Sequence, residues 1–126
     1  MADQYAQYVI VDDIHINSKL TLGEDVADLG GEILAYVAWK DANKGKDLRP
    51  VDGLTPEQRF FIGFAQWDCS NQRPEDQRLR AITDAHSPSY ARINGVVVNM
   101  PEFAQAFGCK TGQPMVKPPE KVCKVW

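Results

Sequence analysis

Gly23-Glu24-Asp25-Val26-Ala27-Asp28 begins the segment that decides the fold of this 126-residue chain. The sequence from Glu24 to about Ala42 has helical periodicity. Its apolar residues form one predicted stripe, made of Val26, Leu29, Ile33 and Val37. Residues four apart share a helix face, so Glu24 and Asp28 are expected to lie side by side. This spacing can place one carboxylate on a metal ion while the second orients a neighbouring ligand.

The adjoining face of this helix carries small residues below the two carboxylates, namely Gly31, Ala35, Ala38 and Ala42. Glycine within a helix costs about 1 kcal/mol relative to alanine. Gly30 and Gly31 therefore suggest that another backbone approaches this surface closely. We expect the small-residue face to pack against a helix that the chain does not contain. In the chain alone it should be exposed, or covered by self-association with a second copy.

The paired carboxylates are typical of one half of a zinc site. A catalytic zinc takes about three protein ligands and a water. The usual complement is His-Glu-x-x-His on another helix, which supplies two ligands and a general base. That motif does not occur here, and His15 and His86 are too far apart to imitate it. The sequence thus predicts part of a metallopeptidase, and the chain alone is not expected to bind zinc tightly.

Composition narrows the class of protein. With 44% hydrophobic residues, the chain is long enough for one globular domain with a core. A net charge of −3 argues against a nucleic-acid-binding surface, and no apolar run reaches the roughly 18 residues of a membrane span. The odd cysteine count fits either reduced thiols or partners outside the chain, and the residues concerned are Cys69, Cys109 and Cys123.

The segments around the long helix show further signals. Residues 5–22 have alternating and β-branched character around Asp12-Asp13, which predicts a short extended or hairpin-like segment. Thr55-Pro56-Glu57-Gln58 is a strong helix start with a capping box. The aromatic residues that follow at helical spacing are expected in the core: Phe60, Phe61, Phe64 and Trp67.

The second half of the chain is less regular. Residues 75–82 are predicted to be helical, and residues 83–88 to form a loop. Asn99 can cap a short helix that extends to about Phe107, with Glu102 as the capping-box partner. The proline-containing tail is expected to be irregular.

Asp84-Ala85-His86-Ser87-Pro88, followed by Arg92, is the second group of candidate functional residues. A histidine near a carboxylate can donate a proton toward a developing oxyanion while the acid fixes its tautomer. Arg92 is suited to hold a peptide carbonyl or carboxylate. Taken singly, a loop histidine or a surface arginine is more often structural or solvated.

Together these stretches resemble the C-terminal part of the neprilysin and endothelin-converting-enzyme family of zinc endopeptidases, including their bacterial relatives. The resemblance runs in order from about Tyr5 to Trp126. Its pieces are Leu20–Gly31, Phe60–Trp67, Arg73-Pro74-Glu75, His86-Ser87-Pro88 with Arg92, Asn99–Phe103, and Cys123–Trp126.

The resemblance implies a role for each matching residue. Glu24 matches the third zinc ligand, and Asp28 matches a partner of a zinc-bound histidine. His86 matches the residue that stabilises the tetrahedral intermediate, supported by Asp84, and Arg92 matches a residue that binds a substrate backbone carbonyl.

This chain departs from the family pattern at one place near the zinc ligand. It has Asp25-Val26 where the family has Asn-Ile, which adds a charge beside the ligand and puts substrate edge contacts there in doubt. The three cysteines match positions that pair with upstream cysteines in animal members, so that those partners would lie outside this chain.

We therefore expect a mainly α fold with a short β or extended N-terminal segment, the C-terminal part of a thermolysin-like (gluzincin) catalytic domain. Residues 1–126 would form one portion of that domain, without the His-Glu-x-x-His helix. The expected function is zinc-dependent hydrolysis of internal bonds in oligopeptides by the full-length protein, which the resemblance places outside the cytoplasm, periplasmic or secreted.

Two alternatives to this function remain open. The chain is alternatively a stand-alone, non-catalytic binding module that retains the peptidase fold. The second and weaker alternative is a small metal-binding protein that uses His15, His86 and the cysteines.

Overall fold

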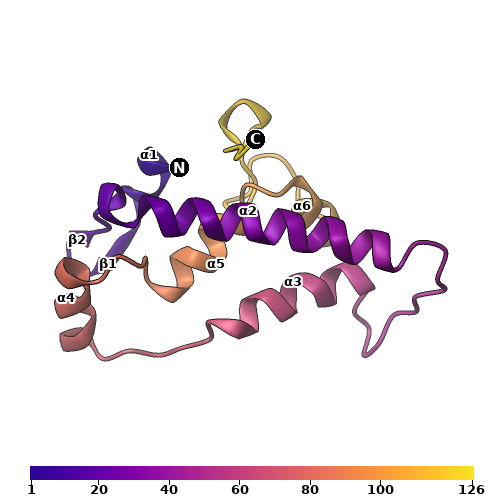
Figure 1. Cartoon of the computed structure of the whole chain (residues 1–126), viewed down its shortest axis with the longest axis horizontal. Helices are drawn as coiled ribbons and strands as arrows, with labels where there is room; N and C mark the ends of the chain where they lie inside the picture. The colour runs from indigo at the N-terminus through magenta and orange to yellow at the C-terminus, as the bar shows by residue number, and fades with distance from the viewer.

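A single long helix, α2 (Ser18–Ala42), runs along most of the molecule; α3 (Pro56–Trp67) and α5 (Ser89–Val97) lie beside it, and α4 (Pro74–Thr83) stands at one end next to the N-terminal strands (Figure 1). The computed structural model describes all residues from 1 to 126. The predicted helix end at Ala42 is confirmed, but α2 begins well before the predicted start at Glu24. Within the first turns, Thr21 Oγ1 donates a hydrogen bond to Asp25 Oδ2 at 2.7 Å. This i,i+4 bond offsets the preference of a β-branched residue for extended backbone.

The buried side of α2 differs from the predicted apolar stripe. Leu29 is buried and Val37 is 59% exposed, while Val26 and Ile33 are half-buried. The helix instead turns a partly polar side inward, with Ser18, Thr21, Asp25, Leu29, Gly30 and Glu32 as its buried residues. The stripe prediction was wrong at Val37, because the buried side of α2 is centred on Asp25, Leu29 and Glu32 and leaves Val37 facing solvent.

The N-terminal segment confirms the predicted hairpin. Strands β1 (Val9–Val11) and β2 (Ile14–His15) pair antiparallel, with Val9 opposite His15. Asp12, in the turn between them, has a φ of 54°, a left-handed conformation that aspartate tolerates better than most residues. A short helix that the sequence did not predict, α1 (Ala2–Tyr5), precedes the hairpin and buries the ring of Tyr5.

Helix α3 (Pro56–Trp67) begins as predicted. Thr55 Oγ1 accepts a hydrogen bond from the Gln58 backbone N–H, and Gln58 Oε1 accepts one from the Thr55 N–H. Phe61 is buried and Phe60 and Phe64 pack beside the core. Trp67, expected in the core, is 53% exposed because it lies at the C-terminal end of the helix.

The second half of the chain forms three more helices, of which α4 (Pro74–Thr83) was predicted closely. Helix α5 (Ser89–Val97) was not predicted. Helix α6 (Pro101–Ala106) lacks the predicted asparagine cap, because its N-cap residue is Met100. The Asn99 side chain instead donates to the carbonyl of Gly95 and accepts from the backbone N–H of Cys123, and thus ties the chain end to α5.

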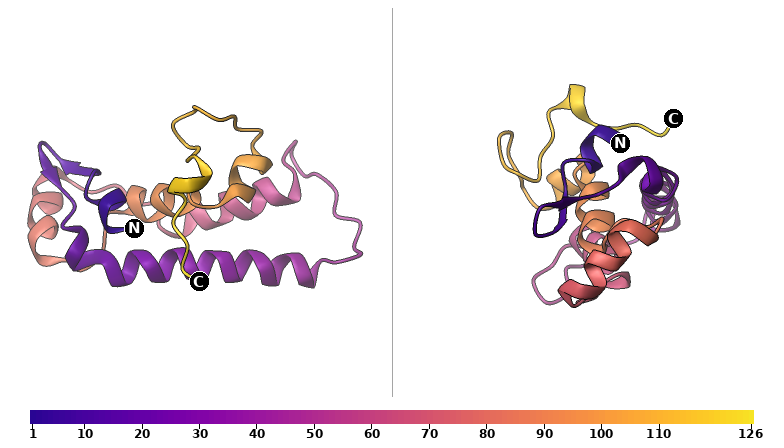
Figure 2. Two further views of the ribbon diagram at one scale, coloured as in Figure 1. Left: turned by 90° about the horizontal axis from the view of Figure 1, so that it is seen from above. Right: turned by 90° about the vertical axis from the view of Figure 1, so that its left-hand side faces the viewer.

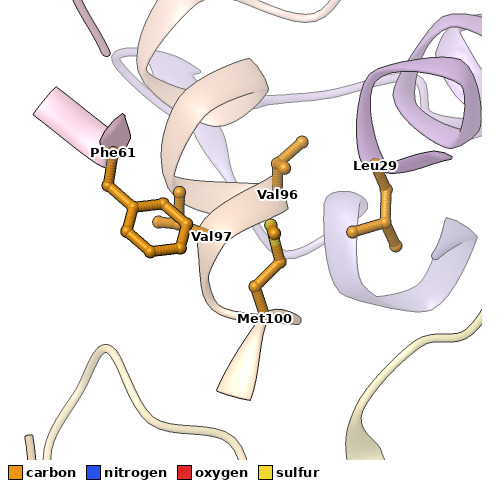
Figure 3. Close-up of a cluster of buried hydrophobic side chains, with 5 residues drawn as sticks. All are labelled: Leu29, Phe61, Val96, Val97 and Met100. Atoms are coloured by element: carbon orange, nitrogen blue, oxygen red, sulfur yellow. The ribbon is translucent and has the colours of Figure 1, made fainter. Parts of the chain in front are cut away.

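The main core forms where α2, α3 and α5 meet (Figure 3). It contains Leu29, Phe61, Val96, Val97 and Met100. A smaller cluster of Tyr5, Ile16 and Ala91 packs the N-terminal segment against α5. These two clusters hold α5 against α2 and so fix the relative positions of the residues described below.

The C-terminal segment, with the 3-10 helix η1 (Pro119–Lys121), returns to α2 (Figure 2). A Cβ on Gly30 would lie 3.3 Å from the ring of Trp126, so the close neighbour of Gly30 is a side chain of this chain. A Cβ on Gly31 would meet nothing within 4 Å. As expected for the chain alone, Gly31, Ala35 and Ala38 are exposed. None of the helices is both long and apolar enough to span a membrane.

Candidate active site

The five candidate site residues come from separate parts of the sequence and meet beside the N-terminal half of α2. Glu24 and Asp28 lie on α2, and Arg92 lies on α5. Asp84 is the C-cap of α4, and His86 lies in the short loop before Pro88, the N-cap of α5. The end of α4 and the start of α5 are only a short loop apart in the sequence, and this loop holds His86 close to Glu24 on α2.

Asp84 binds the ring of His86. Its Oδ1 accepts a hydrogen bond from the His86 backbone N–H at 2.9 Å and lies 2.8 Å from His86 Nδ1. The backbone N–H is the main reason that the pKa of Asp84 falls to about 2, with the histidine ring and the Arg80 guanidinium acting in the same direction. An ionised carboxylate only accepts hydrogen bonds, so Nδ1 carries a proton and Nε2 is left for other partners.

Nε2 of His86 faces Glu24. The distance from Nε2 to Glu24 Oε2 is 3.3 Å, and both side chains are almost half exposed, at 46% and 47%. These two groups therefore lie at an open surface where a ligand can reach them. The Glu24 carboxylate on α2 thus faces a histidine whose other ring nitrogen, Nδ1, already contacts Asp84.

Arg92 and Asp28 form a two-bond ion pair across α5 and α2. Arg92 Nε and Nη2 donate to Asp28 Oδ2 and Oδ1, each at 2.7 Å. These bonds raise the pKa of Arg92, and its guanidinium also lies 4.9 Å from the ring centre of Trp67. Both side chains are largely buried, which makes this pair stronger than an exposed one. The sequence did not predict that these two residues bind each other.

Asp25, the residue next to Glu24, lies inside the protein. Its side chain is fully buried, and burial raises its pKa despite the hydrogen bond from Thr21. Because Asp25 is not exposed in this chain, its burial agrees with the doubt about substrate edge contacts at this position. The i,i+4 spacing of Thr21 and Asp25 was the signal in the sequence that could have revealed this.

The structure brings together no complete metal site. Nowhere do three side chains from His, Cys, Asp or Glu come together to hold a metal ion. His15 instead contacts the carbonyl of Ala6 through Nδ1 at 3.1 Å, and all three cysteines are free. A small metal centre built from His15, His86 and the cysteines is therefore wrong. Glu24, exposed and next to His86, remains suited to contribute one oxygen ligand to a site completed by other residues.

A cavity of about 400 Å³ opens beside His86 and Arg92. Its lining is mostly polar and includes Arg80, Ser87 and Ser89. Arg80 was missed in the sequence, although it precedes Asp84 by four residues on one helix face and pairs with it. The cavity therefore adds a polar surface next to the candidate site.

Comparisons with known proteins identify the family of this chain. The sequence profile of peptidase family M13 matches residues 1–123. Neprilysin-1 of Caenorhabditis elegans is 46% identical over 119 residues, which cover 90% of this chain and 16% of that protein. Human endothelin-converting enzyme 1 is 43% identical over 129 residues, which cover 100% of this chain and 16% of that enzyme. The chain thus spans about one sixth of the length of these relatives.

Solved structures show the same fold. The cryo-EM structure of the Mycobacterium tuberculosis zinc metalloprotease Zmp1 in its open state superposes with a TM-score of 0.93 at 34% identity, over 99% of this chain and 20% of Zmp1. The crystal structure of Zmp1 in complex with an inhibitor gives a TM-score of 0.92. The predicted mainly α fold and the family resemblance are confirmed. The chain belongs to peptidase family M13.

Proposed function

We propose that this chain is the C-terminal part of a zinc metalloendopeptidase that hydrolyses internal bonds of oligopeptides. The observation that carries the proposal is the alignment of Asp84, His86 and Glu24 through contacts of 2.8 and 3.3 Å. Family membership supports the same conclusion. Peptide substrates and a zinc requirement are inferred for the full-length protein, together with an extracytoplasmic location, which rests on the family resemblance alone.

Glu24 would be the third zinc ligand. Its carboxylate is almost half exposed, and its nearest partners within the chain are His86 Nε2 at 3.3 Å and Arg92 Nη2 at 3.9 Å. Bound zinc would polarise the scissile carbonyl and lower the pKa of the attacking water. The other two ligands and the general base would come from a His-Glu-x-x-His helix outside these residues.

His86 would stabilise the oxyanion. Because Asp84 fixes the proton on Nδ1, a second proton on Nε2 would be aimed toward Glu24 and the reacting carbonyl. A donor held in place before the reaction stabilises developing charge without reorganisation. The Asp84–His86 pair thus resembles the acid–histidine arrangements of other hydrolases in role, although it arises here within one loop.

Asp28 and Arg92 would act as a pair. A carboxylate has about four lone-pair positions, so Asp28 can still accept a hydrogen bond from a zinc-bound histidine while it binds Arg92. Arg92 in turn retains N–H donors that can bind a backbone carbonyl of the substrate. Trp67, beneath the guanidinium, would help to hold it in position.

The test compares His86→Ala with Arg92→Ala in the full-length enzyme. His86→Ala should lower kcat by roughly 100-fold with little change in KM, because the lost bond forms mainly in the transition state and costs about 3 kcal/mol. Arg92→Ala should also raise KM, because the proposed carbonyl contact exists in the bound ground state. Steady-state kinetics on a quenched peptide measures both effects.

The alternative of a non-catalytic binding module makes the opposite prediction. A full-length protein that turns over no peptide with zinc present, yet binds peptides, would favour the module. A change in kcat of less than about twofold on His86→Ala would remove the oxyanion role.

A further inference from the structure

Arg80 lies directly behind the proposed catalytic histidine. It occupies the last turn of α4, one turn before Asp84. Its Nε donates to Asp84 Oδ2 at 2.8 Å, and Nη2 contacts the same oxygen. Arg80 carries no sequence signal of its own for function, and it has no part in the proposed function.

The two oxygens of Asp84 are divided between its two partners. Oδ1 accepts from the backbone N–H and contacts the ring Nδ1 of His86, whereas Oδ2 accepts only from Arg80. The Asp84 side chain is 18% exposed, so little solvent competes for these positions. Each oxygen thus has a fixed direction, and rotation of the carboxylate would break bonds on both sides.

The division of the two Asp84 oxygens between His86 and Arg80 also fixes the orientation of the His86 ring. The direction of Asp84 Oδ1 sets the direction of the Nδ1–H bond, which in turn sets where Nε2 points. Nε2 is the atom 3.3 Å from Glu24. A displaced carboxylate would therefore displace the donor at the reacting carbonyl, and small misplacements of a catalytic group are costly.

We propose that Arg80 is a positioning residue, which acts through Asp84 to hold Nε2 of His86 in its reactive direction. This inference rests on the proposed function. Arg80 itself touches neither Glu24 nor, in this role, the substrate. Its effect belongs to the chemical step rather than to substrate binding.

The same helix supplies a matched control. Arg78 also donates through Nε to a carboxylate at 2.8 Å, but its partner is Asp12 in the hairpin turn, on the side away from His86. The side chains of Arg78 and Arg80 are 45% and 46% exposed. The two arginines thus have similar surroundings and similar bonds, and only one of them reaches the site. Exposed ion pairs generally contribute little to stability, so neither substitution should prevent folding.

The experiment is a double-mutant cycle in the full-length enzyme with zinc bound. Arg80→Gln should lower kcat about tenfold, as the loss of an outer partner of a catalytic group commonly does, with KM within about twofold. Arg78→Gln should change neither constant. In an Asp84→Asn background, Arg80→Gln should have no further effect, because its route to His86 has been removed. If Arg80 acted only on stability or only as part of the cavity wall, the effect of Arg80→Gln would not depend on the presence of Asp84.

The outcomes separate the two proposals. If His86→Ala and Asp84→Asn lower kcat but Arg80→Gln does not, the role of Arg80 is overturned and the proposed function stands. A loss on Arg80→Gln that is equally large in the Asp84→Asn background, or that appears in KM, also overturns it. If His86→Ala leaves kcat unchanged, the proposed function fails and the positioning role fails with it.

Discussion

The two ends of one face of α2 differ sharply in what packs against them. Its N-terminal part, the packed side, meets α5 and the α4–α5 loop, where Asp28 binds Arg92 at 2.7 Å and Glu24 lies 3.3 Å from His86. Further along the same face, on the open side, Gly31 has no neighbour for an added Cβ within 4 Å, and Ala35 and Ala38 are exposed. One helix face thus passes from paired polar residues to exposed small residues.

The difference shows which parts of the site this chain builds by itself. The pairs Asp84–His86 and Arg92–Asp28 need only α2, α4 and α5, and they are already formed. What the chain does not build is the neighbour of the small-residue face, where the proposed histidine-bearing helix would pack. The polar contacts of the candidate site are therefore internal to these residues, whereas the proposed zinc binding would need ligands from a second surface.

Gly95→Ala tests the packed side and has the largest expected effect on stability. A Cβ on Gly95 would lie 2.5 Å from the hydroxyl of Tyr5, which is fully buried and unable to move away. We expect the 126-residue chain to lose about 3 kcal/mol of unfolding free energy, at the upper end of typical overpacking costs. Urea unfolding followed by circular dichroism measures this loss.

Gly31→Ala is the matched control, because it makes the same change within a helix on the open side. Alanine is the better helix former, and nothing obstructs its Cβ, so this variant should gain about 0.5–1 kcal/mol. Equal losses in both variants would show that the outward face is packed after all.

Ala35→Leu extends the comparison to the full-length enzyme. If the histidine-bearing helix covers the small-residue face, the larger side chain should cost about 1–3 kcal/mol there and displace Glu24 from the metal, with loss of activity. In the 126-residue chain Ala35 is exposed, so the change should be close to neutral. Thermal melts of both proteins, with and without the substitution, measure the contrast. A loss in the shorter chain as large as in the full-length enzyme would contradict the open face.

The predictable parts of the fold were those with strong local signals. The hairpin follows from alternation around Asp12-Asp13, and α3 follows from the capping box of Thr55 and Gln58. Helix α5 was missed because Gly95 and the β-branched Val96 and Val97 argue locally against a helix. Its helical form depends on packing with residues far away in the sequence, including Tyr5 and Leu29.

The site was predictable to a similar degree. The family resemblance singled out Glu24, Asp84 and His86, and the structure brings them together, although their roles remain predictions. The pairing of Arg92 with Asp28 could not be predicted because the two residues lie on different helices and are 64 positions apart in the sequence. Local spacing did permit the Arg80–Asp84 pair to be foreseen, whereas the direction in which Asp25 points depends on how α2 is rotated against α5.

Glu32 is a buried residue of α2 that lacks a partner, and it provides the last and smaller test. It is only 7% exposed, and its Oε1 has no hydrogen-bond partner. Burial raises its pKa from the ordinary 4.5 to about 7. Between these values the folded chain keeps a proton that the unfolded chain releases, so stability should fall as pH rises from 4.5 to 7 and then level off.

Glu32→Gln removes this titration and keeps the shape of the side chain. The variant should be more stable than the unsubstituted chain by about 1 kcal/mol at pH 8, because a neutral amide is less costly to bury than a carboxylate. At pH 4, where Glu32 is protonated in both states, the two should be nearly equal. Urea unfolding of the 126-residue chain at both pH values measures the difference, with Glu57→Gln, at a more exposed position of α3, as the control. A gain that is the same at pH 4 and pH 8 would mean that Glu32 is not titrating in the interior, and the pH dependence assigned to its burial would then be wrong.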